Sequence, residues 1–174
     1  MSTVHRPCAP RGFTLIELMV SVAIVGVLSS VAIPEMHRAT LRARKAERQT
    51  IMEAVARAVN DVVSARQAVP NNGNWTTPDW NPQGVPGTSK RQFNWGMAGW
   101  TELPMVVEGD SYYSYRFVCI DNAGLTTLDV LAQGDLDGDG ILDTKVLHYT
   151  GLGYSFQPAN PAETPLPGLN ENVF

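Results

Sequence analysis

The chain has few cysteines, few histidines and no excess of positive charge, and each shortage excludes a class of protein. Its two cysteines, Cys8 and Cys119, allow at most one intramolecular disulfide, so a disulfide-scaffold protein is excluded. The three histidines form no metal-ligand spacing, and we find no Ser-His-Asp cluster and no phosphate loop. A net charge of −4 argues against a nucleic-acid-binding protein, which normally has a basic face. We therefore expect neither an enzyme nor a nucleic-acid partner.

Charge is also scarce in one long segment near the N-terminus. Residues 13–33 read FTLIELMVSVAIVGVLSSVAI, and Glu17 is the one charged residue among them. At about 1.5 Å per helical residue this segment is about 31 Å long, close to the hydrocarbon thickness of a bilayer. The run is longer than the core of a secretory signal and continues into a charged helical pattern. We therefore predict a membrane-spanning helix.

The residues that flank this helix predict its orientation. The short leader carries Arg6 and Arg11, and the positive-inside rule keeps such a leader in the cytoplasm and exports the C-terminal part. Glu17 is the anomaly inside the span. An ionisable group there costs about 2.5–3.5 kcal/mol on insertion scales and marks a functional site by default.

The residues around Glu17 resemble the class III signal sequence of type IV pilins and of type II secretion pseudopilins. The matching stretch runs from Arg11 to Val20 and reads RGFTLIELMV. The resemblance implies that a prepilin peptidase cuts between Gly12 and Phe13 and that the new N-terminal Phe13 is N-methylated. It also implies that Glu17 pairs with the terminal amine of a neighbouring subunit during assembly.

A second helical pattern follows the apolar run. Residues 35–68 contain no glycine or proline, and their apolar side chains recur at spacings of three or four: Ile51, Val55, Ala58, Val59 and Val62. Such spacing predicts one buried helical face, and we expect a single helix over residues 13–68. Its first half is predicted to be the membrane span or filament core, and its second half to pack on a sheet.

Basic side chains are concentrated in residues 35–69, which hold seven Lys and Arg against four Asp and Glu. One interpretation is a solvated helix surface whose charges form ion pairs along the helix. The other is contact with the acidic surface of adjacent subunits. Both interpretations stay open at this point.

The part that follows is acidic and begins with an unusual loop. Residues 70–174 hold four basic and twelve acidic residues. Residues 71–104 are rich in Asn, Gly and Pro and contain all four tryptophans, Trp75, Trp80, Trp95 and Trp100. Such a long connection is often functional. The tryptophans either pin the loop onto a sheet or present exposed aromatic faces to a sugar or to another subunit.

Three segments after this loop are predicted strands. In residues 113–119 the aromatic side chains recur with a period of two, and residues 125–132 and 141–150 are further candidates. Residues 134–140 are predicted to form the hairpin connection between the last two. We expect an antiparallel meander of three or four strands packed on the helix, with Cys119 as a small buried hydrophobe.

The hairpin connection also carries a set of carboxylates. Residues 135–143 read DLDGDGILD, which follows the register of an EF-hand loop with a glycine at the sharp turn. The predicted ligands are Asp135, Asp137, Asp139 and Asp143, with Ile141 offering its carbonyl oxygen. The match is incomplete, because Val146 stands where an EF-hand has its bidentate Glu. The loop is therefore either a calcium site or a solvated turn.

Together the segments and the resemblance predict an α+β pilin fold with a long N-terminal helix packed on a three- to four-stranded antiparallel sheet. Its parts are a cleaved leader over 1–12, an apolar transmembrane or assembly helix over 13–34, an amphipathic helix over 35–69, a loop and antiparallel sheet forming a globular head over 70–156, and a Pro-rich tail over 157–174. The tail has too many prolines for regular structure and is either disordered or an extended cover over the sheet.

The resemblance implies a structural subunit of a type IV pilus-like filament, a major or minor pilin. Its implied partners are other pilin subunits, the prepilin peptidase and methyltransferase, and an inner-membrane assembly platform. The chain would span the inner membrane once, with a periplasmic head, before it enters a surface pilus or a periplasmic pseudopilus. Two alternatives stay open: a pseudopilin of a type II secretion system, and a monomeric membrane-anchored calcium-binding adhesive module. No cofactor is expected apart from Ca²⁺.

Overall fold

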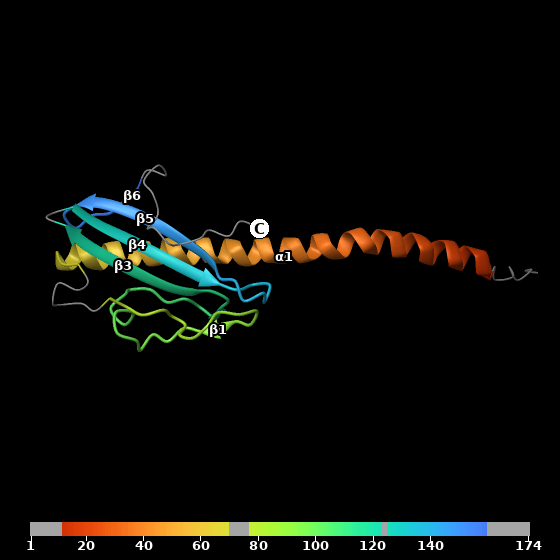
Figure 1. Ribbon diagram of the computed structural model, residues 1–174, viewed down its shortest axis with the longest axis horizontal. Coiled ribbons are helices and arrows are strands. Elements are labelled where there is room, and N and C mark those ends of the chain that lie inside the picture. Colours follow the sequence, from red (N-terminus) through yellow and green to blue (C-terminus); the bar gives the residue numbers. More distant parts are fainter. Residues whose placement is uncertain (1–11, 70–76, 123–124, 160–174) are drawn as a thin grey trace, which may run out of the picture. The chain divides into compact units, whose positions relative to one another are not determined.

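A computed structural model describes residues 12–69, 77–122 and 125–159 (Figure 1). Residues 1–11 of the predicted leader, Trp75 and residues 160–174 of the predicted tail lie outside the described residues. The chain divides into two compact units, residues 1–42 and 43–174. Among the described residues, one helix is followed by six strands, which confirms the predicted α+β class.

Helix α1 runs from Leu15 to Arg66 and begins and ends within two residues of the predicted bounds. Pro34 lies inside this helix without ending it. The chain leaves the helix at Gln67, whose φ of 50° is the left-handed conformation that commonly terminates helices. The length and type of the predicted element are therefore confirmed.

The second half of α1 buries one face, as the spacing of apolar residues predicted. Val55, Val59 and Val62 are buried, whereas Ile51 is only partly buried and Met52 is fully buried in its place. The buried stripe is therefore rotated slightly from the predicted one. Ala and Val dominate it, and such small side chains let a helix approach a sheet closely.

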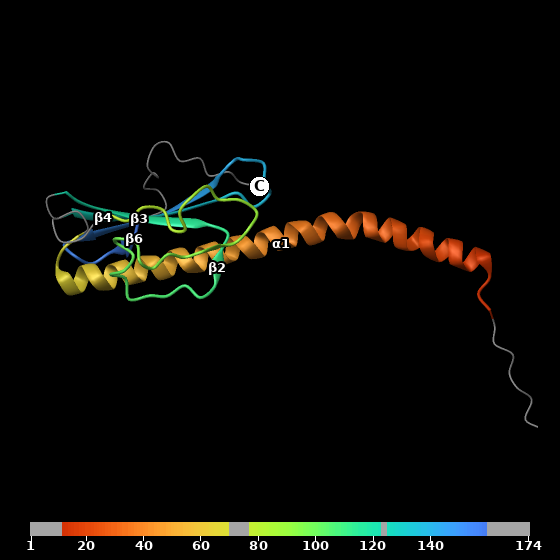
Figure 2. The same ribbon diagram turned by 90° about the horizontal axis from the view of Figure 1, so that it is seen from below.

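The sheet that α1 packs against has four antiparallel strands in the order β3, β4, β5, β6. Strand β3 is Ser114–Asn122, β4 is Leu125–Gly134, β5 is Asp143–Leu152 and β6 is Gln157–Pro158. Two short strands, β1 at Arg91–Gln92 and β2 at Asp110–Ser111, pair separately. Figure 2 shows the sheet and the second half of α1 as two layers.

Strand β6 differs from the prediction that the chain has no regular structure after residue 156. It pairs through Gln157 with Thr150 and through Pro158 with Tyr149. A proline is tolerated there because β6 is an edge strand, where one side of the backbone needs no ladder hydrogen bond. Residues 160–174, the rest of the predicted tail, lie outside the described residues.

The side chains that alternate along β3 face α1 and form the core. Tyr115, Phe117 and Cys119 are buried, as the period of two predicted. Burial raises the pKa of Cys119 to about 12, so this thiol is an unreactive small hydrophobe.

The tryptophan-containing loop is pinned to this core by its aromatic side chains. Trp100 is fully buried, with its ring centroid 5.5 Å from that of Phe117, and its Nε1–H donates to the carbonyl oxygen of Asp79 at 3.0 Å. Phe93 stacks on Tyr115 at 5.7 Å and on the half-buried Trp95 at 5.2 Å. For Trp100 these contacts favour the pinning interpretation over an exposed binding face.

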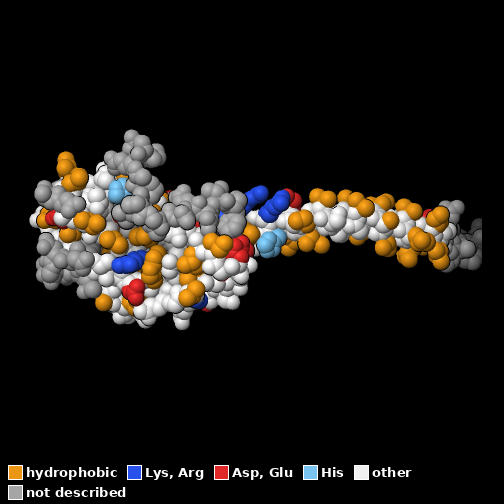
Figure 3. Space-filling model, viewed as in Figure 1, with side chains coloured by type: hydrophobic (Ala, Val, Ile, Leu, Met, Phe, Trp, Pro, Cys, Tyr) orange, Lys and Arg blue, Asp and Glu red, His pale blue; other side chains and the backbone are white. Residues whose placement is uncertain are grey.

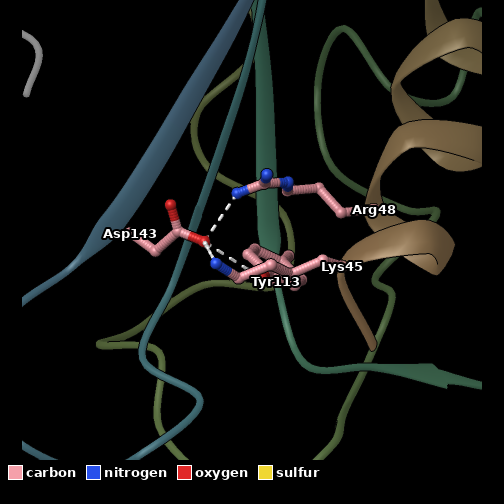
Figure 4. A network of polar contacts seen from close by, with 4 residues as sticks. All are labelled: Lys45, Arg48, Tyr113 and Asp143. Atoms are coloured by element: carbon pink, nitrogen blue, oxygen red, sulfur yellow. Dashed lines mark hydrogen bonds and ion pairs between the residues drawn. The ribbon is translucent and has the colours of Figure 1, made fainter. Parts of the chain in front are cut away.

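A buried ion pair connects α1 to the start of β5 (Figure 4). The Arg48 guanidinium donates to Asp143 Oδ2 at 2.7 Å, and Lys45 Nζ lies 3.9 Å from the same oxygen. The Tyr113 hydroxyl donates to that oxygen at 3.3 Å, and burial raises the pKa of Tyr113 well above its usual range. Two hydrogen-bond donors and one nearby ammonium group therefore compensate the burial of one carboxylate.

Replacement of Asp143 tests the importance of this ion pair. Because Asp143→Ala leaves the Arg48 charge buried without its partner, we expect the free energy of unfolding to fall by about 3–5 kcal/mol. The exposed helix residue Asp61 supplies the matched control, and Asp61→Ala is expected to change it by no more than about 0.5 kcal/mol. Denaturant unfolding of the full chain in detergent measures both. Equal effects of the two substitutions would contradict this role.

Candidate assembly site and carboxylate loop

The predicted cleavage point lies outside the helix. Gly12 and Phe13 precede the first helical residue, Leu15, and Phe13 is 83% exposed. A peptide bond outside a helix has no helical hydrogen bonds to break before an enzyme binds it. The Gly12–Phe13 bond is therefore accessible in the described structure.

Thr14 and Glu17 cap the start of α1 reciprocally. The backbone N–H and the hydroxyl of Thr14 both donate to Glu17 Oε2, at 2.9 and 2.8 Å. The Glu17 N–H donates back to Thr14 Oγ1 at 3.3 Å. This arrangement is a capping box, which satisfies two backbone donors that a helix start otherwise leaves free. Its T-x-x-E pattern is a local signal in the sequence, although the capping box is not among the predictions made above.

The capping box holds one oxygen of the Glu17 carboxylate and leaves the other available. Among the described residues, no hydrogen bond to Glu17 Oε1 is found. The Glu17 carboxylate is therefore held in a fixed orientation about one helical turn from Phe13. Its second oxygen, Oε1, accepts no hydrogen bond from a described residue. An ammonium group from another molecule is the kind of partner that this oxygen can accept.

The first half of α1 leaves its apolar side chains uncovered. Every large hydrophobic side chain from Phe13 to Ile33 is at least half exposed, and Figure 3 shows them along the first half of α1. Among the described residues, α1 is the one helix long and apolar enough to cross a membrane. A surface of this kind needs lipid or other protein around it.

The carboxylate loop brings three of the four predicted aspartates together. One oxygen from each of Asp135, Asp137 and Asp139 lies within 4.8 Å of the others. Asp135 is buried and accepts from the N–H groups of Gly138 at 2.7 Å and Gly140 at 3.2 Å. Both glycines have φ near 80°, a conformation that favours glycine.

The other two predicted calcium ligands, Asp143 and Ile141, have other contacts in the structure. The Asp143 carboxylate contacts Arg48 and is not part of the cluster of three. Ile141 donates its N–H to Asp139 Oδ1 at 2.7 Å. Sequence spacing did not reveal the Arg48 contact, because the two residues are 95 positions apart.

The basic stretch of α1 is largely paired within the chain. Arg38 forms an ion pair with Glu35 at 2.8 Å, and Arg44 lies over the ring of Tyr112 at 4.3 Å. Arg48 and Lys45 contact Asp143 as described above. Of these four residues, Arg38 alone forms the ion pair along the helix that the first interpretation describes. Arg44, Lys45 and Arg48 instead contact residues outside α1 in the same chain, and Arg42 is exposed and has no ion pair with a described residue.

Substitution of Thr14 tests the capping box. Thr14→Val keeps the shape of the side chain but removes its oxygen, and we expect the first turn of α1 to lose about 1 kcal/mol. Hydrogen exchange of the Glu17 amide, measured by NMR on the full chain in detergent, should become about fivefold faster. Thr14→Ser keeps the oxygen and should restore slow exchange. Equally slow exchange in the Val variant would contradict the box.

Comparison with known proteins adds independent information on the N-terminal segment. The family model of the prokaryotic N-terminal methylation motif matches residues 9–33. The chain is 41% identical over 75 residues to the type IV major pilin protein PilE1 of Neisseria gonorrhoeae, which is 43% of this chain and 31% of that protein. It is 47% identical over 45 residues to the type IV major pilin protein PilA of Myxococcus xanthus, which is 26% of this chain and 20% of that protein.

A third relative is a fimbrial protein of Pseudomonas aeruginosa, 42% identical over 60 residues that make up 34% of this chain and 32% of the relative. The chain therefore spans about a third or less of the length of these relatives. No solved structure matches the chain significantly.

Proposed function

We propose that this chain is a member of the type IV pilin family and a structural subunit of a pilus-like filament, and its methylation motif and its similarity to pilins support the proposal. One observation carries the proposal: the apolar first half of α1, whose large hydrophobic side chains are all at least half exposed, holds a single carboxylate, Glu17, about one helical turn from the cleavage point. An anchor alone needs neither the carboxylate nor the motif. The role is structural and not catalytic.

Cleavage between Gly12 and Phe13 creates the charge that assembly uses. The new ammonium group of Phe13 and the carboxylate of Glu17 are both poorly solvated in apolar surroundings, and each gains from a partner of opposite sign. If each Phe13 amine pairs with Glu17 of a neighbour, the apolar helices join side by side in one register. The filament core then buries the side chains from Phe13 to Ile33 that a single chain leaves exposed.

The same proposal assigns the chain's location and partners. Before assembly α1 spans the inner membrane, and the head, which follows residue 42, is periplasmic. A prepilin peptidase that also methylates Phe13 acts on the cytoplasmic side, and a membrane platform delivers subunits to the filament. The exposed apolar half of α1 and the basic leader support this orientation.

Glu17→Ala separates assembly from insertion and processing. We expect the variant to enter the membrane and to be cut before Phe13, because the apolar run and the cleavage point are unchanged. Removal of one partner of a buried ion pair costs about 3–5 kcal/mol, so filaments that contain the variant should fall below detection. Mass spectrometry of the mature N-terminus and recovery in sheared filaments measure the two steps.

Glu35→Ala is the matched control, because Glu35 lies on the same helix in an exposed ion pair with Arg38. This variant should assemble as the wild type does, since an exposed pair contributes at most about 1 kcal/mol. Wild-type amounts of filament with Glu17→Ala, or an uncut chain that starts at Met1 in cells, would overturn the proposed function.

We also propose that the carboxylate loop binds Ca²⁺ through Asp135, Asp137 and Asp139. Closely spaced carboxylates repel one another unless a cation lies between them, and Ca²⁺ prefers oxygen ligands from such loops. The Ile141 carbonyl and water would complete the coordination. Asp143 is left out of this ligand set, because its carboxylate contacts Arg48.

Calcium should therefore raise the melting temperature of the chain. At a free Ca²⁺ concentration ten times Kd, the expected stabilisation is about 1.4 kcal/mol. Asp137→Asn should abolish the shift, whereas Asp61→Asn, on the exposed face of α1, should retain it. A melting temperature independent of Ca²⁺ in the wild type would show that the loop is a solvated turn.

A further inference from the structure

A groove of about 520 Å³ lies along helix α1 in the head. One wall is the helix, through Glu47, Ile51 and Ala54, and the other is the segment from Met105 to Asp110. Figure 2 shows this segment, in green, running beside α1 before it enters β2. The floor is mainly apolar, and Val106 at its edge is 75% exposed.

Acidic side chains lie at the rim of this groove. Glu108 and Asp110 are both exposed, and neither forms an ion pair with any described residue. Glu47, at the same rim, has Lys90 Nζ 3.6 Å away as its partner. Asp110 pairs across β1 and β2 with Gln92, which is two residues from Lys90 in the sequence. The rim therefore presents two carboxylates that have no ion pair with a described residue.

A complementary cation is exposed on the same helix of every copy. Arg42 has no ion-pair partner among the described residues, in contrast to its neighbours Arg38 and Arg48. It lies five residues before Glu47, which at about 100° per residue is about 140° around the helix. Arg42 and Glu47 therefore leave helix α1 on different sides, so two different neighbours can contact them at once.

The proposed pairing of Phe13 with Glu17 determines which residues of two copies meet. If the Phe13 amine of one copy is level with Glu17 of its neighbour, the copies are offset by four residues, or about 6 Å. Identical copies keep this offset along the whole helix. Arg42 of the first copy then lies about level with Ala46 of the neighbour, next to Glu47 and the acidic rim.

We propose that the groove beside α1 is the docking surface for the Arg42 segment of a second copy of this chain, with Arg42 pairing with Glu108 and Asp110. The inference rests on the proposed filament function and extends it from the helix core to the head. The contact is heterologous, since the surface that donates Arg42 differs from the surface that accepts it. Such contacts continue from copy to copy and build open helical filaments.

Charge reversal on each side tests the contact. Arg42→Glu alone, and Glu108→Arg with Asp110→Arg alone, place like charges opposite each other and should each reduce sheared filament about tenfold or more. The combined variant restores opposite charges with the signs exchanged and should recover most of the filament. Arg57→Glu reverses another exposed arginine on α1 and serves as the control. Any loss of filament that it causes should not be recovered when Glu108→Arg and Asp110→Arg are added.

Site-directed crosslinking gives a second readout. Cells that make one variant with Arg42→Cys and another with Glu108→Cys should form a dimer when treated with a bismaleimide crosslinker. A crosslinker is needed because the Cα atoms of a paired Arg and Glu are farther apart than the about 7 Å that a direct disulfide allows. Arg57→Cys paired with Glu108→Cys should not. Cys119 is buried and contributes no background.

The results separate this inference from the function beneath it. The docking surface is wrong if the losses of filament from the two reversals add in the combined variant and no crosslink forms. If wild-type filaments still depend on Glu17 in that case, the filament function stands. If the wild-type chain never enters filaments, the proposed function itself fails. Rescue together with the crosslink supports the contact.

Discussion

The apolar surface from Phe13 to Ile33 is the constraint on which the rest of the molecule depends. Among the described residues none covers it, since the buried face of α1 begins only at Arg48. In the proposed function, lipid covers this surface before assembly and other copies of the same helix cover it afterwards. Glu17 would make that exchange directional, since a buried carboxylate requires a cationic partner at one defined position. On this proposal the hydrophobic effect supplies the attraction, and the ion pair supplies the register.

The head is built so that α1 and the sheet hold together without a disulfide. Met52, Val55 and Val59 are fully buried, and Trp100 closes the core from the long loop. The buried carboxylate of Asp143 joins β5 to the helix through Arg48. Such a pair contributes less net stability than equivalent apolar packing, but it penalises any other alignment of the two elements, because both charges are then buried without partners.

Much of this architecture was predictable from local patterns. The length of the apolar run predicted the first half of α1, and the period of two in residues 113–119 predicted the inner face of the sheet. Thr14 was readable too, since its capping pattern with Glu17 is local. The Arg48–Asp143 contact was not, because it joins residues 95 positions apart and nothing local distinguishes Asp143 from the aspartates before it. The small strand β6 was missed because its proline is tolerated only at a sheet edge.

A helical reconstruction of filaments made by this chain tests the central claim most directly. The measured quantity is the distance from the Phe13 nitrogen of one subunit to the nearest Glu17 carboxylate oxygen of its neighbour. The account predicts that the two atoms lie within ion-pair reach, about 4 Å, in every subunit. It would be contradicted if Glu17 in the filament contacted only its own Thr14, with the Phe13 amine in solvent.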